Sequence, residues 1–218
     1  MDFQYEFVLS TLPQLMQGVK LTIQITVYGL VGGMALGVIT GLILAYRIPF
    51  LNYVGAGYVW IIRGTPIVVQ AMFVYFALPL AMGIRMTGVY AAILVLAINA
   101  GAYIAEIVRG AVLSINKGLV DAGLALGLSR LQVTRYVVGP LAFRRMIPPL
   151  GNQFIIGLKD TSLFIVIGVG ELTRQGQEIM ASSFRALEVW TAVALIYLLL
   201  TTVLALSLRW LERRMKII

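Results

Sequence analysis

The chain of 218 residues contains no cysteine and no histidine. It therefore cannot form disulfide bonds, thiol nucleophiles or serine–histidine hydrolase sites, and it lacks the usual ligands of zinc and copper. We expect no metal site. The phosphate-binding pattern GxxxxGK(S/T) is also absent, so the chain has no Walker-type nucleotide site. Any ATP that drives its function must be hydrolysed by another protein.

Charged residues make up only 12% of the chain, whereas hydrophobic residues make up 60% and the mean hydropathy is +0.94. A water-soluble core of this size cannot hide so many apolar side chains. Five lipid-spanning helices of about 20 residues would use roughly 100 of them. The sequence therefore predicts an all-α integral membrane protein.

Long apolar stretches predict about five transmembrane helices in a single transmembrane domain of residues 1–218. They cover residues 21–46, 51–82, 89–107, 149–170 and 189–211. The acidic N-terminus lacks the basic segment of a signal peptide, so we expect the first stretch to remain as a span. No internal repeat is visible, which makes the chain an asymmetric half of a pathway and predicts a symmetric dimer.

The net charge of +8 is distributed unevenly between the two sides of this arrangement. Eleven lysines and arginines lie at Arg47, in the loop 109–148 and near the C-terminus, whereas four lie in the opposite loops. Since basic residues concentrate on the cytoplasmic side, we expect the N-terminus outside and the C-terminus inside. The bilayer, and not nucleic acid, then accounts for the positive charge.

The first stretch carries four glycines at i+4 spacing, Gly29, Gly33, Gly37 and Gly41. This spacing places them on one side of a helix, where they form a smooth ridge that another helix can approach closely in lipid. We interpret the ridge as a helix-packing face.

The second stretch is broken by Arg63, Gly64, Thr65 and Pro66. Thr65 before a proline is typical of a helix N-cap, so a new helical segment should begin at Pro66. A guanidinium beside free helical N–H groups favours a carboxylate ligand. The alternative is that Arg63 pairs with Glu106 or with a lipid phosphate.

Four polar residues, Lys159, Asp160, Thr161 and Ser162, lie near the middle of the fourth stretch. An unpaired charge there costs at least about 2.5–3.5 kcal/mol, so these side chains must face protein, water or a solute. Either they join neighbouring helices or they line a path for a polar solute, and both interpretations remain open.

Four amides lie in apolar surroundings, Gln70, Asn99, Asn152 and Gln153, and hydrogen bonds between helices are their ordinary use. Glu106 and Arg109, three residues apart, predict a local ion pair. Glu171 heads the polar outer loop and could face a solute, a soluble partner or water. The candidate residues of a solute pathway are Arg63, Thr65, Gln70, Asn99, Lys159, Asp160, Thr161, Ser162 and Glu171.

The basic loop 109–148 contains a short apolar helix, residues 118–128, whose exposed leucines predict a groove on another protein as its partner. Asp121, Ala122 and Gly123 are followed by Gly127, and Pro140 comes thirteen residues later. This pattern resembles the signature of the membrane subunits of bacterial ATP-binding-cassette (ABC) importers, with aspartate in place of glutamate, Val137 for isoleucine and Gly139 for leucine. The resemblance implies that this segment is the coupling helix, which contacts the ATPase through Asp121, Ala122, Gly123, Leu124 and Gly127.

Other motifs extend the resemblance over nearly the whole chain. IRGTPIVVQ, NAGAYIAEIVRGAVLS, LGLSR and LKDTSL resemble the polar amino-acid uptake branch of these permeases, and VGELTRQGQEI with the RRMKI tail is most similar to its glutamine-transporting members. The resemblance implies a type I ABC importer fold in the bacterial inner membrane and alternating access for a polar amino acid, with L-glutamine as the expected cargo. Glutamate, arginine, histidine and cystine are alternatives.

The same resemblance implies partners. They are a second permease copy, two cytoplasmic ATPases that hold ATP and Mg²⁺, and a periplasmic amino-acid-binding protein, with a heterodimer of two similar permeases as an alternative. An ion-coupled secondary carrier, with Asp160, Lys159 and Glu106 as an ion relay, is a separate hypothesis. The small number of spans and the lack of an inverted repeat argue against it. A membrane enzyme is disfavoured because no cofactor motif or second convergent carboxylate is visible.

Overall fold

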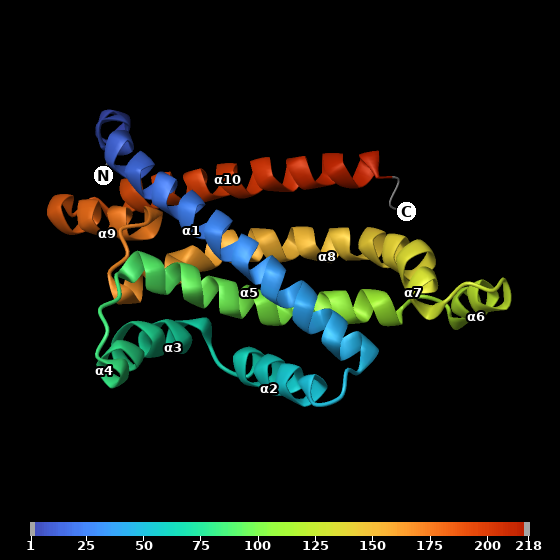
Figure 1. Cartoon of the computed structure of the whole chain (residues 1–218). Helices are drawn as coiled ribbons and strands as arrows, with labels where there is room; N and C mark the ends of the chain where they lie inside the picture. Colours follow the sequence, from blue (N-terminus) through green and yellow to red (C-terminus); the bar gives the residue numbers. More distant parts are fainter. Residues whose placement is uncertain (1–2, 216–218) are drawn as a thin grey trace.

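The structure, a computed structural model, describes residues 3–215 and consists of helices joined by short connections (Figure 1). The helices are α1 (Tyr5–Tyr46), α2 (Leu51–Arg63), α3 (Ile67–Met72), α4 (Leu78–Met82), α5 (Gly88–Leu113), α6 (Lys117–Ala125), α7 (Arg130–Val133), α8 (Gly139–Asp160), α9 (Leu172–Ser183) and α10 (Ala186–Arg214). Two π-helical segments, Phe73–Ala77 and Thr134–Val138, and the 3₁₀ helix Thr161–Ile167 directly follow α3, α7 and α8 in the chain.

Four of the helical stretches are long and apolar enough to cross a membrane. They are Tyr5–Tyr46, Gly88–Leu113, Arg130–Ile167 and Ala186–Arg214. The pair Leu51–Arg63 and Ile67–Met82 makes a fifth if its two halves, bent by 104°, form one broken span. The predicted fold class, an all-α membrane protein with about five spans, is confirmed.

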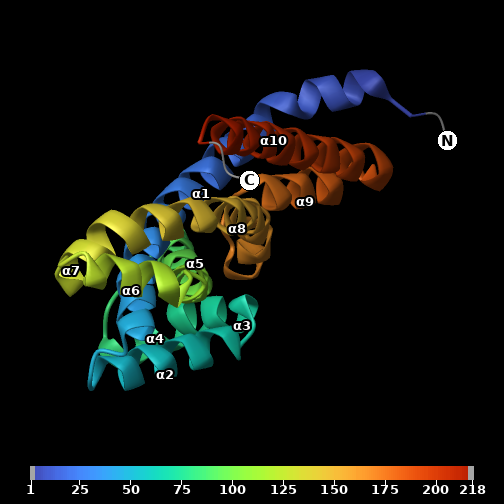
Figure 2. The same ribbon diagram turned by 90° about the vertical axis from the view of Figure 1, so that its right-hand side faces the viewer.

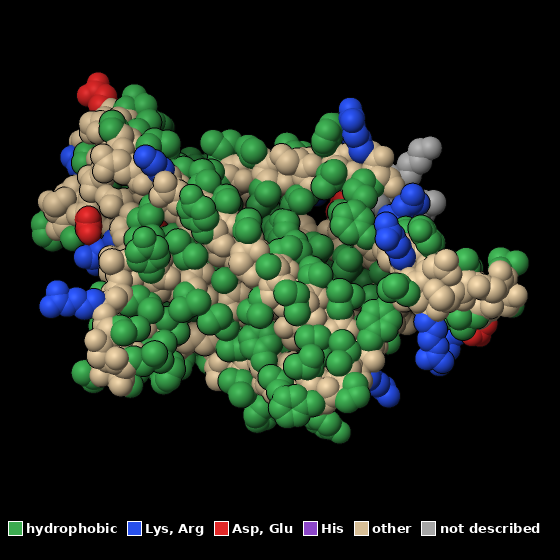
Figure 3. Space-filling model, viewed as in Figure 1, with side chains coloured by type: hydrophobic (Ala, Val, Ile, Leu, Met, Phe, Trp, Pro, Cys, Tyr) green, Lys and Arg blue, Asp and Glu red, His purple; other side chains and the backbone are tan. Residues whose placement is uncertain are grey.

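The helices surround α5, which supplies much of the buried core. Seen from the α6 end, α2 and α3 lie on one side of α5, and α9 and α10 lie on the other (Figure 2). Hydrophobic side chains cover the middle of the face in Figure 3, whereas charged side chains gather at its two ends. This distribution suits a bilayer core between two aqueous surfaces.

The glycine ridge of α1 lies against α5 of the same chain. A Cβ atom on Gly29 would come within 2.7 Å of Leu96, and one on Gly41 would come within 2.6 Å of Val108. Such distances leave no room for a side chain, so the two helices are in backbone-to-side-chain contact along the ridge.

Several helices begin or end outside the predicted apolar stretches. α1 begins at Tyr5, well before residue 21, and α8 already begins at Gly139 inside the loop 109–148. The polar outer loop expected after residue 170 is largely the amphipathic helix α9. Hydropathy alone misses these segments because polar faces interrupt an apolar run without interrupting a helix.

Candidate functional site

The break between α2 and α3 is built by Arg63, Gly64, Thr65 and Pro66. α2 ends at Arg63, and Pro66, with an extended backbone, is the N-cap residue of α3. The Thr65 hydroxyl donates back to the Ile61 carbonyl at 3.0 Å and does not cap α3, so the prediction that Thr65 is the N-cap was wrong. The helix nonetheless restarts next to Pro66, as the proline predicted.

A cavity of about 500 Å³, here called the midplane cavity, opens at this break. Its polar lining residues are Arg63, Thr65, Asn99, Tyr103, Gln153 and Asp160. They come from the break, from α5 and from α8, so three distant parts of the sequence meet there. The cavity offers charges of both signs and two amides, and its volume lies within the roughly 300–1,000 Å³ of small-molecule sites.

Gln70 links the two halves of the break to α5. Its amide nitrogen donates to the Ile62 carbonyl at 2.9 Å and to the Thr65 hydroxyl oxygen at 2.9 Å. Its amide oxygen accepts from Asn99 Nδ2 at 3.0 Å. Gln70 therefore does not line the cavity but orients Asn99, which is buried and does. The expected hydrogen bond between helices is present for this pair.

Arg63 lies beside Glu106 while it lines the cavity. Arg63 Nη1 is 3.8 Å from Glu106 Oε2, and its guanidinium lies 5.3 Å from the centre of the Tyr103 ring. Arg109 holds the same carboxylate more tightly, with Nε at 3.1 Å from Oε1 and Nη2 at 2.7 Å from Oε2. The predicted Glu106–Arg109 pair is therefore present, and Arg63 is only loosely tied to it.

The four polar residues of the fourth stretch do not act together. Asp160 lines the midplane cavity, whereas Lys159 is exposed outside its lining. The Thr161 hydroxyl donates to the Leu158 carbonyl at 2.7 Å, and the Ser162 hydroxyl donates to the Lys159 carbonyl at 2.7 Å. Both hydroxyl protons are thus used within the helix itself.

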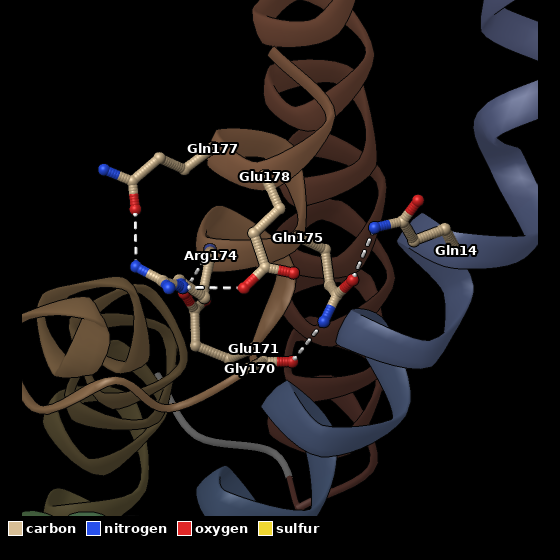
Figure 4. A network of polar contacts seen from close by, with 7 residues as sticks. All are labelled: Gln14, Gly170, Glu171, Arg174, Gln175, Gln177 and Glu178. Atoms are coloured by element: carbon tan, nitrogen blue, oxygen red, sulfur yellow. Dashed lines mark hydrogen bonds and ion pairs between the residues drawn. The ribbon is translucent and has the colours of Figure 1, made fainter. Parts of the chain in front are cut away.

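Glu171 is the N-cap residue of α9, next to Arg174 of the same helix (Figure 4). It is not among the residues that line the midplane cavity. Its side chain is fully buried and accepts hydrogen bonds from the backbone N–H groups of Thr173 and Arg174, both at 2.9 Å, and from the Tyr197 hydroxyl at 2.8 Å. Burial raises the pKa of the Glu171 carboxyl above its usual range, although these three donors act in the opposite direction. The carboxylate joins α9 to α10.

Two of the polar residues that line the cavity, Tyr103 and Gln153, were not among the candidates for the pathway. Tyr103 gives no signal in a sequence, since a tyrosine in a span is ordinary. For Gln153, which is 6% exposed, the sequence alone predicts only a hydrogen bond between helices. Its position seven residues before Asp160, two helical turns away on the same face of α8, could have connected the two.

The short helix α6 projects from the end of the bundle (Figure 1). Asn116 caps it by accepting from Gly118 N at 2.8 Å, and Gly127 ends it with a φ of +83°. Gly123 is buried, and a Cβ there would lie 3.0 Å from Val133 of α7. Asp121, Ala122 and Leu124 are exposed.

Leu126 beside them is 83% exposed, so α6 presents an apolar surface that the described chain leaves uncovered. Within residues 3–215 no cluster of three or more histidine, cysteine, aspartate or glutamate side chains could hold a metal ion. The arrangement therefore offers a polar cavity near the middle of the bundle and an exposed apolar surface on α6 at one end.

Comparison with known proteins assigns the chain to a family. Residues 33–217 match the family described as the binding-protein-dependent transport system inner membrane component. The chain belongs to this family. It is a non-catalytic membrane-spanning permease component of a binding-protein-dependent ABC transporter, and it lies in the inner membrane.

Individual relatives share its full length. The chain is 57% identical to the glutamine transport system permease protein GlnP of Escherichia coli (strain K12), over 100% of both chains. It is 34% identical to the probable amino-acid permease protein YxeN of Bacillus subtilis (strain 168), covering 97% of this chain and 95% of that one. A crystal structure of an amino acid ABC transporter with histidines matches with a TM-score of 0.91 and 31% identity, covering 98% of this chain and all of that one.

Proposed function

We propose that this permease moves L-glutamine inward by alternating access and that the midplane cavity is where the cargo is bound. The observation that carries the proposal is the chemistry of the cavity lining, which holds one guanidinium, one carboxylate and two amides. The full-length similarity to a glutamine permease supports the same cargo.

Each polar group of glutamine has a counterpart in this lining. Arg63 suits the α-carboxylate, and Asp160 suits the α-ammonium group. Asn99 and Gln153 each carry an amide donor and an amide acceptor, which match the donor and acceptor of the glutamine side chain. Thr65 and the chain that follows it close the cavity at the break. Lys159, Thr161, Ser162 and Glu171 do not line the midplane cavity, so none of them contacts the cargo there. Glu171 supports the pathway through the cap of α9 and its bond to α10.

The exposed surface of α6 supports a coupling role. We assign to Asp121, Ala122, Leu124 and the turn at Gly127 the contact with a cytoplasmic ATPase, and to Gly123 the packing of α6 on α7. Closure of two ATPases on ATP and Mg²⁺ would then move α6 and, through α7 and α8, the walls of the midplane cavity. The functional unit is two permease copies, two ATPases and a periplasmic binding protein, with the N-terminus outside and the C-terminus inside.

The test is transport by the complete complex in proteoliposomes, with ATP on the ATPase side and the binding protein on the other. Glutamine, glutamate, asparagine, arginine, histidine and cystine are compared for uptake and for stimulation of ATP hydrolysis. We expect glutamine alone to drive both. Stimulation by a different amino acid would show that glutamine is not the cargo. Uptake that follows an ion gradient without ATP would show that transport is not driven by ATP.

A further inference from the structure

A second cavity lies on the other side of Arg63. It has a volume of about 570 Å³, and its polar lining residues are Arg47, Asn52, Arg63, Glu106 and Arg109. This inner cavity lies between the end of α1, α2 and α5, on the side of the bundle where the α1–α2 connection lies and from which α6 projects (Figure 1). It is thus nearer than the midplane cavity to the end that we assign to the ATPase.

The two cavities share Arg63 and Gly64 in their linings. Arg63 is held only loosely at this boundary, since its closest carboxylate oxygen, on Glu106, lies 3.8 Å away and its side chain is 43% exposed. A guanidinium in that position can face a ligand on either side without breaking a tight hydrogen bond. The wall between the two cavities therefore contains a group that can bind a carboxylate.

The inner cavity has an excess of positive charge. Three guanidinium groups line it, against the single carboxylate of Glu106. That carboxylate is already engaged on both oxygens by Arg109. Within residues 3–215, Arg47 forms no ion pair. An anion in this cavity would therefore meet an unneutralised guanidinium, which is the preferred partner of a carboxylate.

The excess charge, the shared Arg63 and the position toward the ATPase end fit one ligand. We propose that the inner cavity is an exit-side subsite for the carboxylate of the amino-acid cargo, with Arg47 as its ligand and Arg63 as the group common to both cavities. The proposal rests on the proposed function, because the cargo must first occupy the midplane cavity. During transport, the cargo carboxylate first binds Arg63 in the midplane cavity and then binds Arg47 in the inner cavity.

Because the chain contains no cysteine, a single introduced cysteine is its only thiol, and its labelling can test the inner cavity directly. Ala56→Cys and Asn52→Cys place a thiol in the inner cavity, Ile67→Cys places one in the midplane cavity, and Val54→Cys, on an exposed part of α2, serves as the control. Each variant is assembled with a cysteine-free ATPase in nanodiscs of phosphatidylcholine. The rate of alkylation by N-ethylmaleimide is then measured with and without L-glutamine at up to about 50 mM, which saturates a site of millimolar affinity.

We expect glutamine to slow alkylation of Ala56→Cys by at least about fivefold, as near-complete occupancy requires, and to leave Val54→Cys unaffected. The analogue 4-aminobutanamide, which lacks the carboxylate, should give no protection. Addition of Arg47→Gln should abolish the protection at Ala56→Cys, whereas Arg213→Gln, at the end of α10, should preserve it. Asn52→Cys gives the same readout if Ala56→Cys does not assemble.

Four results would overturn the proposal. Protection of Ile67→Cys without protection of Ala56→Cys or Asn52→Cys would remove the inner subsite and leave the proposed function standing. Loss of protection at all of these positions would remove both. Equal protection by 4-aminobutanamide would show that the cavity does not bind the carboxylate of the cargo. Protection that appears only when phosphatidylglycerol is added to the nanodiscs would show that the cavity binds a lipid headgroup.

Discussion

Gly37 of α1 lies directly over Ile104 of α5, so that a Cβ atom on Gly37 would stand 2.6 Å from the Ile104 Cβ atom. Real side chains do not approach so closely, and neither atom belongs to a flexible end that could move aside. Gly37 thus fixes how near α1 can come to α5, and the walls of both cavities depend on the position of α5.

We expect Gly37→Ala to destabilise the protein by about 1–3 kcal/mol, because the added methyl group forces α1 away from α5. Gly110→Ala is the matched control, since no atom lies within 4 Å of a Cβ at that helical position. Alanine there should leave stability unchanged or raise it by up to about 1 kcal/mol. Thermal unfolding of the purified complex measures both, and equal unfolding temperatures for the two variants would contradict the close contact.

The glycine ridge also shows what a sequence can predict about a membrane helix. Spacing at i+4 identifies one face of a helix without any knowledge of its neighbour. It does not identify the partner, because helices of the same chain and of a second copy offer the same apolar surface. The contact of Gly41 with Val108 is therefore information that only the three-dimensional arrangement supplies.

The candidate site was predictable in part for a related reason. Charges in an apolar span must face something polar, and this rule singled out Arg63 and Asp160. The rule cannot separate residues that face a cavity from those that are satisfied within their own helix. Thr161, whose hydroxyl donates to the Leu158 carbonyl, belongs to the second kind. Glu171 is similar, since its role as an N-cap depends on a helix that hydropathy does not reveal.

The Glu171 carboxylate should stabilise α9 through the two backbone N–H groups and the tyrosine hydroxyl that it accepts from. Glu171→Ala leaves these buried donors without a partner, and we expect a loss of about 2 kcal/mol or more. Glu178→Ala removes a carboxylate from the exposed face of the same helix, where it pairs with Arg174, and should change stability by less than about 0.5 kcal/mol.

Hydrogen exchange of the α9 amides distinguishes this cap from a general loss of stability. The amides of Thr173 and Arg174 should exchange faster in Glu171→Ala than in Glu178→Ala. Equal protection of these two amides in both variants would show that Glu171 does not hold the start of α9.

Gly127 allows α6 to end in a left-handed turn, with a φ of +83°. Gly127→Val should disfavour this turn by about 1–2 kcal/mol, which corresponds to a population of the left-handed turn that is lower by about 5–30-fold. Gly127→Asn is the matched control, because asparagine tolerates left-handed backbone. Co-purification of the ATPase and glutamine-stimulated ATP hydrolysis should both fall more in Gly127→Val, and identical values for the two variants would separate the turn from coupling.

Asp160 is the one carboxylate that lines the midplane cavity, so its removal should affect cargo binding directly. A charge-assisted hydrogen bond is worth about 1.5–3 kcal/mol, and we expect Asp160→Asn to reduce glutamine uptake by roughly tenfold to a hundredfold. Asp160→Glu keeps the charge and should retain part of the uptake, whereas Glu178→Gln, on the surface of α9, should retain all of it. ATPase attachment should be the same in every variant, because α6 is distant from the substitution. Unchanged uptake in Asp160→Asn would show that this carboxylate does not bind the cargo. Another residue would then have to bind the ammonium group of the cargo.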